Sequence, residues 1–388
     1  MDINGKIIML GDTHFGSKRF SEEVQKSKMR FIKEQLLPYM KENNIKNILQ
    51  LGDLFDNRVN MNINFFYNFL NEFTDLLEKL DINLYVITGN HDIYFKESRK
   101  VGLLPILDRL YSNFYLINDR TYANINNSKC YLVSWLLETE TLTLNELKDV
   151  EYIFGHFEIR DFQLSKGILD KSSKLSNSFF DKLPNLKAVY SGHYHIKDSK
   201  GKINYIGTPF QLSYSDFKEL KGFYVIDENN NLEFIENKIS PKYSKIYWNS
   251  FEDFPIEYVD TTSKKFKADE LSELSDLIGE SNIQIHLISP KNLDFIALTE
   301  HLANLDIAFT ITDDYTFLKL GEDDGLLVNL ENQDETKNLK NNENRNNKKH
   351  TKTQKLNNSK DIMLEALNDK NPKLVPVVVE IMKDLNIV

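Results

Sequence analysis

Five segments of the sequence share one pattern, in which a short apolar run ends in a glycine followed by aspartate, asparagine or histidine. In the most regular of them, residues 47–51 are followed by Gly52 and Asp53. One such carboxylate alone would favour a helix N-cap or a turn residue. The polar residues of all five segments are Asp12, His14, Asp53, Asn90, His91, Asp92, His156, His193 and His195. Since parallel strands end at the ligand crevice of an α/β sheet, and five of the eight histidines follow this pattern, the sequence predicts a shared metal site.

The chemical types of these residues indicate which metal ions the site would hold. Carboxylates, imidazoles and an amide oxygen together suit Mn²⁺, Fe²⁺ or Zn²⁺, whereas thiolates would favour Zn²⁺ or copper and carboxylates alone Mg²⁺ or Ca²⁺. The expected ligands are Asp12, His14, Asp53, Asn90, His156, His193 and His195. This set is too large for one such ion, so we expect two ions that share a carboxylate. Paired ions activate a water and stabilise the oxygens of an in-line displacement at phosphorus, which predicts hydrolysis of a phosphate ester.

Two residues beside the expected ligands are candidates for proton transfer. His91 adjoins Asn90, so we expect its ring to face the site without being needed as a ligand. A protonated imidazole there could donate its proton to the leaving oxygen. Asp92 could orient His91 or stabilise its charge, and a role as a turn residue is the alternative interpretation of Asp92.

The segments between these polar residues predict the elements that position them. Apolar residues at helical spacing cover residues 24–40 and 63–80, with Ser21 as the N-cap of the first helix. A polar insertion at 160–178 separates two of the later strands. The expected strands are 6–10, 47–51, 84–88, 114–117, 130–135, 151–154, 187–191, 204–206, 222–226 and 232–235, the last three as an antiparallel continuation. This order predicts an α/β fold class, with a two-layer β-sandwich flanked by helices.

Composition is typical of ordinary globular proteins. Of the 388 residues, 41% are hydrophobic and 27% are charged. Cys130, the single cysteine, is expected in the core, and one cysteine fits a reducing compartment and so a cytoplasmic location. We expect neither a signal peptide nor a transmembrane helix. The net charge of −10 argues against a protein that binds nucleic acid by itself through a broad basic surface. It does not argue against a phosphodiester substrate whose negative charge is neutralised by metal ions or by a partner protein.

Changes in composition divide the chain into four parts. Residues 1–240 contain the pattern described above, and residues 241–330 are expected to form a small α+β domain. Residues 331–360 are polar and of low complexity, and they bury too little apolar surface to fold, so we interpret them as a linker. Residues 361–388 contain two short helical patterns. Apolar residues recur at helical spacing in the second of these, at Leu374, Val378, Ile381 and Leu385.

The motifs of the first part resemble those of the calcineurin-like metallophosphoesterases in order and spacing. They are Asp12-x-His14, Gly52-Asp53-x-x-Asp56, Gly89-Asn90-His91-Asp92, Gly155-His156 and Gly192-His193-x-His195. Residues 52–56 and 205–214 are also similar to the nuclease subunit of SbcCD complexes, the meiotic-recombination-eleven type of nuclease. Members in archaea and eukaryotes tend to have histidine where Asp56 stands, so the resemblance points to the bacterial and phage branch and leaves the role of Asp56 open.

This resemblance implies an assignment of the ligands and a set of partners. One ion would take Asp12, His14, Asp53 and His195, the other would take Asp53, Asn90, His156 and His193, and Mn²⁺ is the expected ion. In that family the phosphoesterase domain is followed by a capping domain, a linker and a set of helices. These helices bind an ABC-type, coiled-coil ATPase of the SbcC kind. Residues 241–330, 331–360 and 361–388 match that order.

The resulting hypothesis is an Mn²⁺-dependent DNA exonuclease or endonuclease that acts with such an ATPase in DNA end processing, recombination and double-strand break repair. A homodimer is compatible with it. One alternative is a phosphoesterase of the same fold that acts on a nucleotide or a phosphoprotein. The other is a non-catalytic scaffold, which the complete ligand set disfavours because scaffolds of this kind usually lose ligands.

Overall fold

The computed structural model describes residues 1–239, except 166, 214, 215, 217 and 218, together with five strands between residues 243 and 313. The linker expected at 331–360 and the helical segment expected at 361–388 lie outside the described residues. None of the helices in the described part is long and apolar enough to cross a membrane.

Within that part, one sheet has six strands in the order β15-β14-β2-β3-β4-β5. Its strands are β2 (Ile7–Leu10), β3 (Asn47–Gln50), β4 (Asn83–Ile87), β5 (Phe114–Ile117), β14 (Gly222–Ile226) and β15 (Leu232–Glu236). The four strands from β2 to β5 are parallel, and β14 and β15 are antiparallel additions at one edge. The parallel strands β2, β3 and β4 therefore bring the segments that begin with Asp12, Asp53 and Asn90 to the same end of the sheet.

A second sheet of the described residues has seven strands in the order β1-β6-β7-β8-β11-β13-β12. Its strands are β1 (Asp2–Ile3), β6 (Arg120–Ile125), β7 (Ser128–Val133), β8 (Tyr152–His156), β11 (Ala188–Gly192), β12 (Asp198–Lys200) and β13 (Ile203–Tyr205). The neighbouring strands β8 and β11 are parallel and pair Gly192 with His156. Because these strands run in the same direction, His156 at the end of β8 and His193 directly after β11 lie side by side.

The two sheets pack face to face around one apolar core, which confirms the predicted sandwich. Met9 and Leu49 from the first sheet pack in this core with Leu132, Phe154 and Cys130 from the second, and all five are buried. Cys130 is therefore a core residue, as its neighbours in the sequence predicted. Burial of this apolar surface is the main favourable contribution to folding.

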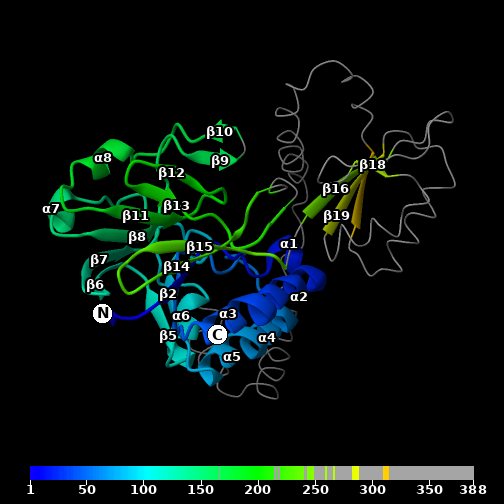
Figure 1. The fold of residues 1–388 in the computed structure, drawn as a ribbon, viewed down its shortest axis with the longest axis horizontal. Helices are drawn as coiled ribbons and strands as arrows, with labels where there is room; N and C mark the ends of the chain where they lie inside the picture. The colour runs from blue at the N-terminus through cyan, green and yellow to red at the C-terminus, as the bar shows by residue number, and fades with distance from the viewer. Residues whose placement is uncertain are drawn as a thin grey trace, which may run out of the picture. The chain divides into compact units, whose positions relative to one another are not determined.

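Helices cover the outer faces of the sandwich, and Figure 1 shows α2 to α5 grouped on the side of the six-stranded sheet away from the second sheet. The helices are α1 (Ser17–Phe20), α2 (Glu22–Phe31), α3 (Leu37–Glu42), α4 (Ile63–Phe69), α5 (Asp75–Lys79), α6 (Leu104–Leu110), α7 (Leu144–Leu147) and α8 (Asn177–Asp181). The π-helical segments Ile32–Leu36 and Leu70–Thr74 join α2 to α3 and α4 to α5. The two long helices predicted from apolar spacing are thus confirmed, and Ser21 caps the first through Val24.

One predicted strand pairs differently from expectation. Residues 204–206 were expected to continue the sheet in an antiparallel sense, but β13 pairs in parallel with β11. The connection runs through β12, which pairs antiparallel with β13 and lies at the edge of the sheet. The polar insertion at 160–178 contains a small hairpin of β9 (Gln163–Ser165) and β10 (Ile168–Leu169).

The part expected to form a capping domain is described only as strands. A three-stranded parallel sheet contains β16 (Tyr243–Trp248), β19 (Asn282–Leu287) and β20 (Phe309–Asp313), and β17 (Tyr258–Val259) pairs with β18 (Lys265–Phe266). The helical patterns expected between these strands lie outside the described residues. The boundaries at 240, 330 and 360 therefore stay predictions.

Candidate metal centre

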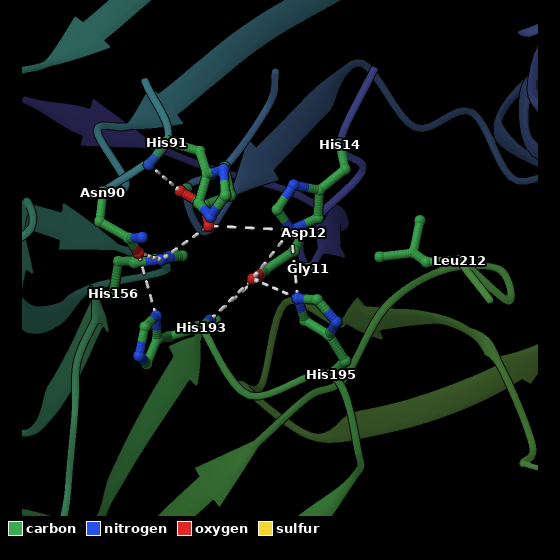
Figure 2. Close-up of polar contacts among 12 residues, drawn as sticks. Gly11, Asp12, His14, Asn90, His91, His156, His193, His195 and Leu212 are labelled. Carbon is green, nitrogen blue, oxygen red and sulfur yellow. Dashed lines mark hydrogen bonds and ion pairs between the residues drawn. The ribbon is translucent and has the colours of Figure 1, made fainter. Parts of the chain in front are cut away.

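Loops from both sheets meet at one end of the sandwich, and they bring together the seven predicted metal ligands and His91. Asp12 and His14 follow β2, Asp53 follows β3, and Asn90 follows β4. The second sheet contributes three imidazoles at the ends of β8 and β11, those of His156, His193 and His195. Figure 2 shows the rings of His14 and His195 on one side of the Asp12 carboxylate, and Asn90, His156 and His193 on the other.

The first group of ligand atoms comprises Asp12, His14 and His195, whose donor atoms all lie within 4.8 Å of one another. The Nε2 atoms of His14 and His195 are 3.1 Å apart. Asp12 Oδ2 lies 3.9 Å from the first of these nitrogens and 3.7 Å from the second. Two imidazole nitrogens and a carboxylate oxygen thus face one small volume.

The second group comprises Asp53, His156 and His193, again within 4.8 Å, and Asn90 joins it. The Oδ1 atom of Asn90 is 3.0 Å from His156 Nε2 and 3.0 Å from His193 Nδ1. Asp53 Oδ2 is 3.4 Å from His156 Nε2 and 3.8 Å from His14 Nε2. Asp53 therefore lies between the two groups and contacts both.

The donor chemistry of the second group fits a cation. His156 Nδ1 is 2.7 Å from the carbonyl oxygen of Leu51, so that nitrogen is the protonated one in a neutral ring. Its Nε2 lone pair then faces the oxygens of Asn90 and Asp53, and three acceptors oppose one another inside the protein. A positive charge among them, either a proton or a metal ion, removes this repulsion.

Ionisation of these residues supports the same interpretation. Burial alone would lower the pKa of His156, but Asp53 and Asp12 outweigh it and raise that pKa to about 10. Burial acts to raise the pKa of Asp53, yet His156 and His14 hold it well below its usual value. The Asp53 carboxylate therefore retains its negative charge and attracts positive charge to this place, as expected of a ligand for divalent cations.

His91 lies beside these groups with its ring held from one side. Its backbone N–H donates to Asp53 Oδ1 at 2.8 Å, and its Nδ1 is 2.6 Å from the carbonyl oxygen of Asp56. Its ring packs edge-on against that of His14, with centroids 4.9 Å apart. His91 also forms a third set of clustered donor atoms with His14 and Asp53, so a ligand role is the alternative to proton transfer.

Asp92 points into the backbone. Its carboxylate accepts hydrogen bonds from the N–H groups of Gly89 at 2.9 Å and Phe55 at 3.1 Å, which ties the β3 and β4 loops together. Burial and the neighbouring charge of Asp53 raise the pKa of Asp92 to about 6. This arrangement favours the alternative interpretation of Asp92 as a residue that shapes the turn.

Strained backbone and closely approached glycines shape these loops. His14, Asp53 and His193 adopt left-handed conformations with φ of 44°, 51° and 86°, which non-glycine residues hold only when their surroundings impose it. A Cβ at Gly52 would lie 2.3 Å from His156 Nδ1, and one at Gly89 would lie 2.2 Å from Asp53 Oδ1. The repeated glycines of the sequence pattern therefore leave room for the ligands themselves.

A buried lysine that sequence reasoning missed supports the first loop. Lys28 on α2 is fully buried, and its Nζ donates to the carbonyl oxygens of Thr13 and His14 and to Ser17 Oγ. Burial lowers the pKa of Lys28 to about 7. The spacing of Lys28, four residues after Val24 within the apolar stripe, is the signal that could have revealed it.

Replacing Lys28 by methionine should destabilise the fold. The substitution keeps the volume but leaves two carbonyl oxygens and a hydroxyl without their donor, and we expect a loss of about 3 kcal/mol in the free energy of unfolding. Denaturant unfolding followed by circular dichroism measures it. The matched control is Lys26→Met on the same helix, where the side chain is 75% exposed. An equal, small effect of both substitutions would contradict the structural role of Lys28.

Trp135 is a second residue that the pattern did not reveal. Its ring lies 5.0 Å from that of His193 and 5.9 Å from that of His156, measured between centroids. It also lines a cavity of about 610 Å³ that reaches Asn90 and His156 and includes the cationic Arg58. The candidate centre thus opens onto a space whose lining carries charges of both signs, the cationic residues Arg58, Lys96 and Lys174 and the acidic residues Glu138, Glu140 and Glu158.

Comparison with known proteins agrees with this geometry. The model of the calcineurin-like phosphoesterase family matches residues 5–197. Exonuclease subunit 1 of Enterobacteria phage T4 is 29% identical over 284 residues, which cover 70% of this chain and 82% of that protein. The DNA double-strand break repair protein Mre11 of Nanoarchaeum equitans (strain Kin4-M) is 26% identical over 249 residues, which cover 57% of this chain and 66% of that protein.

Proposed function

Since the chain belongs, through residues 5–197, to the calcineurin-like phosphoesterases, we propose that it is a divalent-metal-dependent DNA nuclease of recombination and double-strand break repair. The observation that carries the proposal is the position of Asp53 between two groups of ligand atoms. The relatives named as an exonuclease subunit and as a double-strand break repair protein support DNA as the substrate.

The residues that would hold the two ions are those predicted from the sequence. They are Asp12, His14, Asp53 and His195 for one ion, and Asp53, Asn90, His156 and His193 for the other. Mixed oxygen and imidazole donors suit Mn²⁺. When bound, such a pair supplies an activated water and positive charge at the phosphate oxygens.

His91 is proposed as the general acid. Its Nδ1 faces the carbonyl oxygen of Asp56, so this nitrogen donates its proton there and the ring orientation is fixed. Nε2 is then the atom that can hold a second proton and give it to the leaving oxygen of the DNA backbone. The hydrogen bond from the His91 backbone to Asp53 keeps this ring beside the metal ligands. Asp92 acts indirectly, by holding the turn that carries His91.

A substrate panel tests the proposal against phosphatase activity. The full chain with Mn²⁺ is incubated with end-labelled linear duplex DNA, single-stranded DNA, a mononucleotide and a phosphopeptide. We expect cleavage of DNA and little release of phosphate from the last two. Release of phosphate from the mononucleotide or phosphopeptide without DNA cleavage would instead make the chain a phosphatase, and no hydrolysis of any substrate would favour a scaffold.

An ABC-type ATPase is the proposed partner, bound through residues 361–388. These residues lie outside the described part, so the proposal comes from their sequence, in which an apolar stripe follows a polar linker. An amphipathic helix on a tether commonly binds a groove of another protein, and a linker keeps its local concentration high. The partner could also supply a basic DNA-binding surface, since the net charge of −10 argues against a broad basic face on this chain.

Deletion of residues 361–388 should separate the two functions. We expect the shortened chain to cleave short single-stranded DNA at the normal rate and to lose co-elution with the ATPase in gel filtration. The full chain is the control for both measurements. Undiminished co-elution of the shortened chain would place the ATPase contact elsewhere.

The cytoplasmic location and the homodimer, which were also expected from the sequence, remain predictions.

A further inference from the structure

The cavity of about 610 Å³ adjoins the second group of ligand atoms, and two of the proposed ligands, Asn90 and His156, form part of its lining. Small-molecule sites in proteins typically enclose about 300–1,000 Å³. The space is therefore large enough for one nucleotide and too small for a double helix. A phosphate held at the metal ligands would leave the rest of its own nucleotide at this cavity.

The part of the lining next to the ligands is aromatic and apolar. Trp135 lines the cavity, and its ring lies 5.0 Å from that of His193 and 5.9 Å from that of His156. Leu175 and Phe179 also line the cavity, and they are partly buried against a cluster of core residues. Half-buried apolar surface of this kind gains stability when a flat ring covers it.

Hydrogen bonds hold the backbone of Trp135 on both sides. Its N–H donates to the carbonyl oxygen of Thr88 at 2.8 Å, and its carbonyl oxygen accepts a guanidinium N–H of Arg99 at 2.8 Å. Arg99 makes two further hydrogen bonds to the Glu140 carboxylate, both at 2.7 Å, and only 9% of its side chain is exposed. Because this loop is already ordered, a ligand that stacks on Trp135 loses little binding energy to ordering it.

The charges of the lining do not select an anion. Three cationic and three acidic side chains surround the cavity. Of the acids, Glu140 is neutralised by Arg99, whereas Glu138 and Glu158 remain to repel a phosphate. A neutral base meets no such repulsion and finds an aromatic face together with hydrogen-bond donors and acceptors. The chemistry of the cavity therefore suits a nucleobase and not a second phosphate.

We propose that this cavity is a nucleobase subsite, in which Trp135 stacks on the base of the nucleotide whose phosphate lies at the metal ligands. The inference rests on the proposed function and names the part of DNA that the chain recognises, a single unpaired nucleotide. A base must leave the double helix to enter such a cavity. Since every base has a π face, recognition by stacking tolerates any sequence.

Tryptophan fluorescence tests the stacking contact directly. The chain has two tryptophans, so Trp248→Phe leaves Trp135 as the only indole. Deoxyadenosine monophosphate, deoxycytidine monophosphate or deoxyribose 5-phosphate is added to this full-length variant with Mn²⁺. We expect both nucleotides to quench the emission and the sugar phosphate to leave it unchanged. Trp135→Phe, in which only Trp248 emits, is the control and corrects for absorption by the bases. Equal quenching by the sugar phosphate, or none by either nucleotide, would overturn the proposal.

Affinities measured by calorimetry separate stacking from structural support. Trp135→Ala should weaken binding of deoxyadenosine monophosphate about 5–100-fold, the contribution of stacking on one base, and leave binding of deoxyribose 5-phosphate unchanged. Trp135→Phe retains an aromatic face and should keep most of the affinity. Tyr122→Ala removes an aromatic side chain that is 58% exposed and lies outside the cavity, and it should bind as the unchanged chain does. Equal losses for both ligands, or loss of Mn²⁺ from Trp135→Ala, would make Trp135 a support of His193 instead.

Binding of mononucleotides separates this inference from the proposed function. If nucleotides bind through Trp135 but DNA stays intact, the proposed function fails and the nucleobase subsite stands. If DNA is cleaved and the base adds nothing to binding, only the subsite fails.

Discussion

Asp53→Asn is expected to abolish DNA cleavage and to lower the amount of bound Mn²⁺. The two carboxylate oxygens of Asp53 have different partners, because Oδ1 accepts the His91 N–H and Oδ2 faces His14 and His156. The side chain is buried, and nearby imidazoles keep it ionised by lowering its pKa. Asparagine retains the shape but removes the charge that both groups of ligand atoms share, so one substitution weakens both sites.

Bound Mn²⁺ and cleavage rate should be measured on the same preparation of this variant. Elemental analysis after gel filtration gives the metal content, and end-labelled linear DNA gives the rate. Asp149→Asn is a matched control, because it removes one exposed carboxylate without touching the centre. Cleavage at the unchanged rate in Asp53→Asn would contradict the assignment of Asp53 as the shared ligand.

His91→Ala should lose cleavage rate and keep its metal ions. Removal of a general acid typically costs on the order of 10²–10⁴-fold in rate. His91 Nδ1 is engaged with the Asp56 carbonyl, so only Nε2 is free for proton transfer, and the proposed ligand set is complete without it. The backbone N–H that holds Asp53 survives the substitution, so the carboxylate should keep its place.

The metal content of His91 variants decides whether His91 transfers a proton or binds a metal ion as a ligand. This histidine clusters with His14 and Asp53, and a ligand role would make His91→Ala lose Mn²⁺ together with activity. His91→Gln provides the comparison, since glutamine fills the space of the ring and cannot transfer a proton. We expect both variants to bind two ions and to be similarly slow. Loss of an ion from both would reassign His91 as a ligand.

The candidate centre could be predicted from sequence because its residues follow short buried strands and glycines. The carboxyl ends of neighbouring parallel strands lie at the same edge of a sheet. Asp12, Asp53 and Asn90 each follow such a strand, so they were expected to lie close together. The structure adds the reason for the glycines: a side chain at Gly52 or Gly89 would overlap His156 or Asp53. Local sequence and long-range geometry agree here, which is why the pattern was informative.

Other features depend on contacts between distant segments and left little trace in the sequence. Strand β6 was missed because only two of its six residues, Ala123 and Ile125, are buried, and two apolar positions are too few to establish an alternating pattern. The parallel pairing of β13 with β11 is a choice between sheet partners that no local pattern specifies. Lys28 was missed because a buried lysine needs partners, and its partners are backbone carbonyl groups of Thr13 and His14. Backbone groups carry no sequence signal that would mark them as partners of a lysine.

Metal-dependent cleavage of DNA tests the central claim most directly. The full chain is stripped of metal by a chelator, dialysed, and then titrated with Mn²⁺ while bound Mn²⁺ and cleavage of end-labelled linear DNA are followed together. We predict that the stripped chain is inactive and that cleavage rises as two ions bind per chain. Undiminished cleavage by the stripped chain, or a chain that binds two ions and leaves every DNA substrate intact, would contradict the claim.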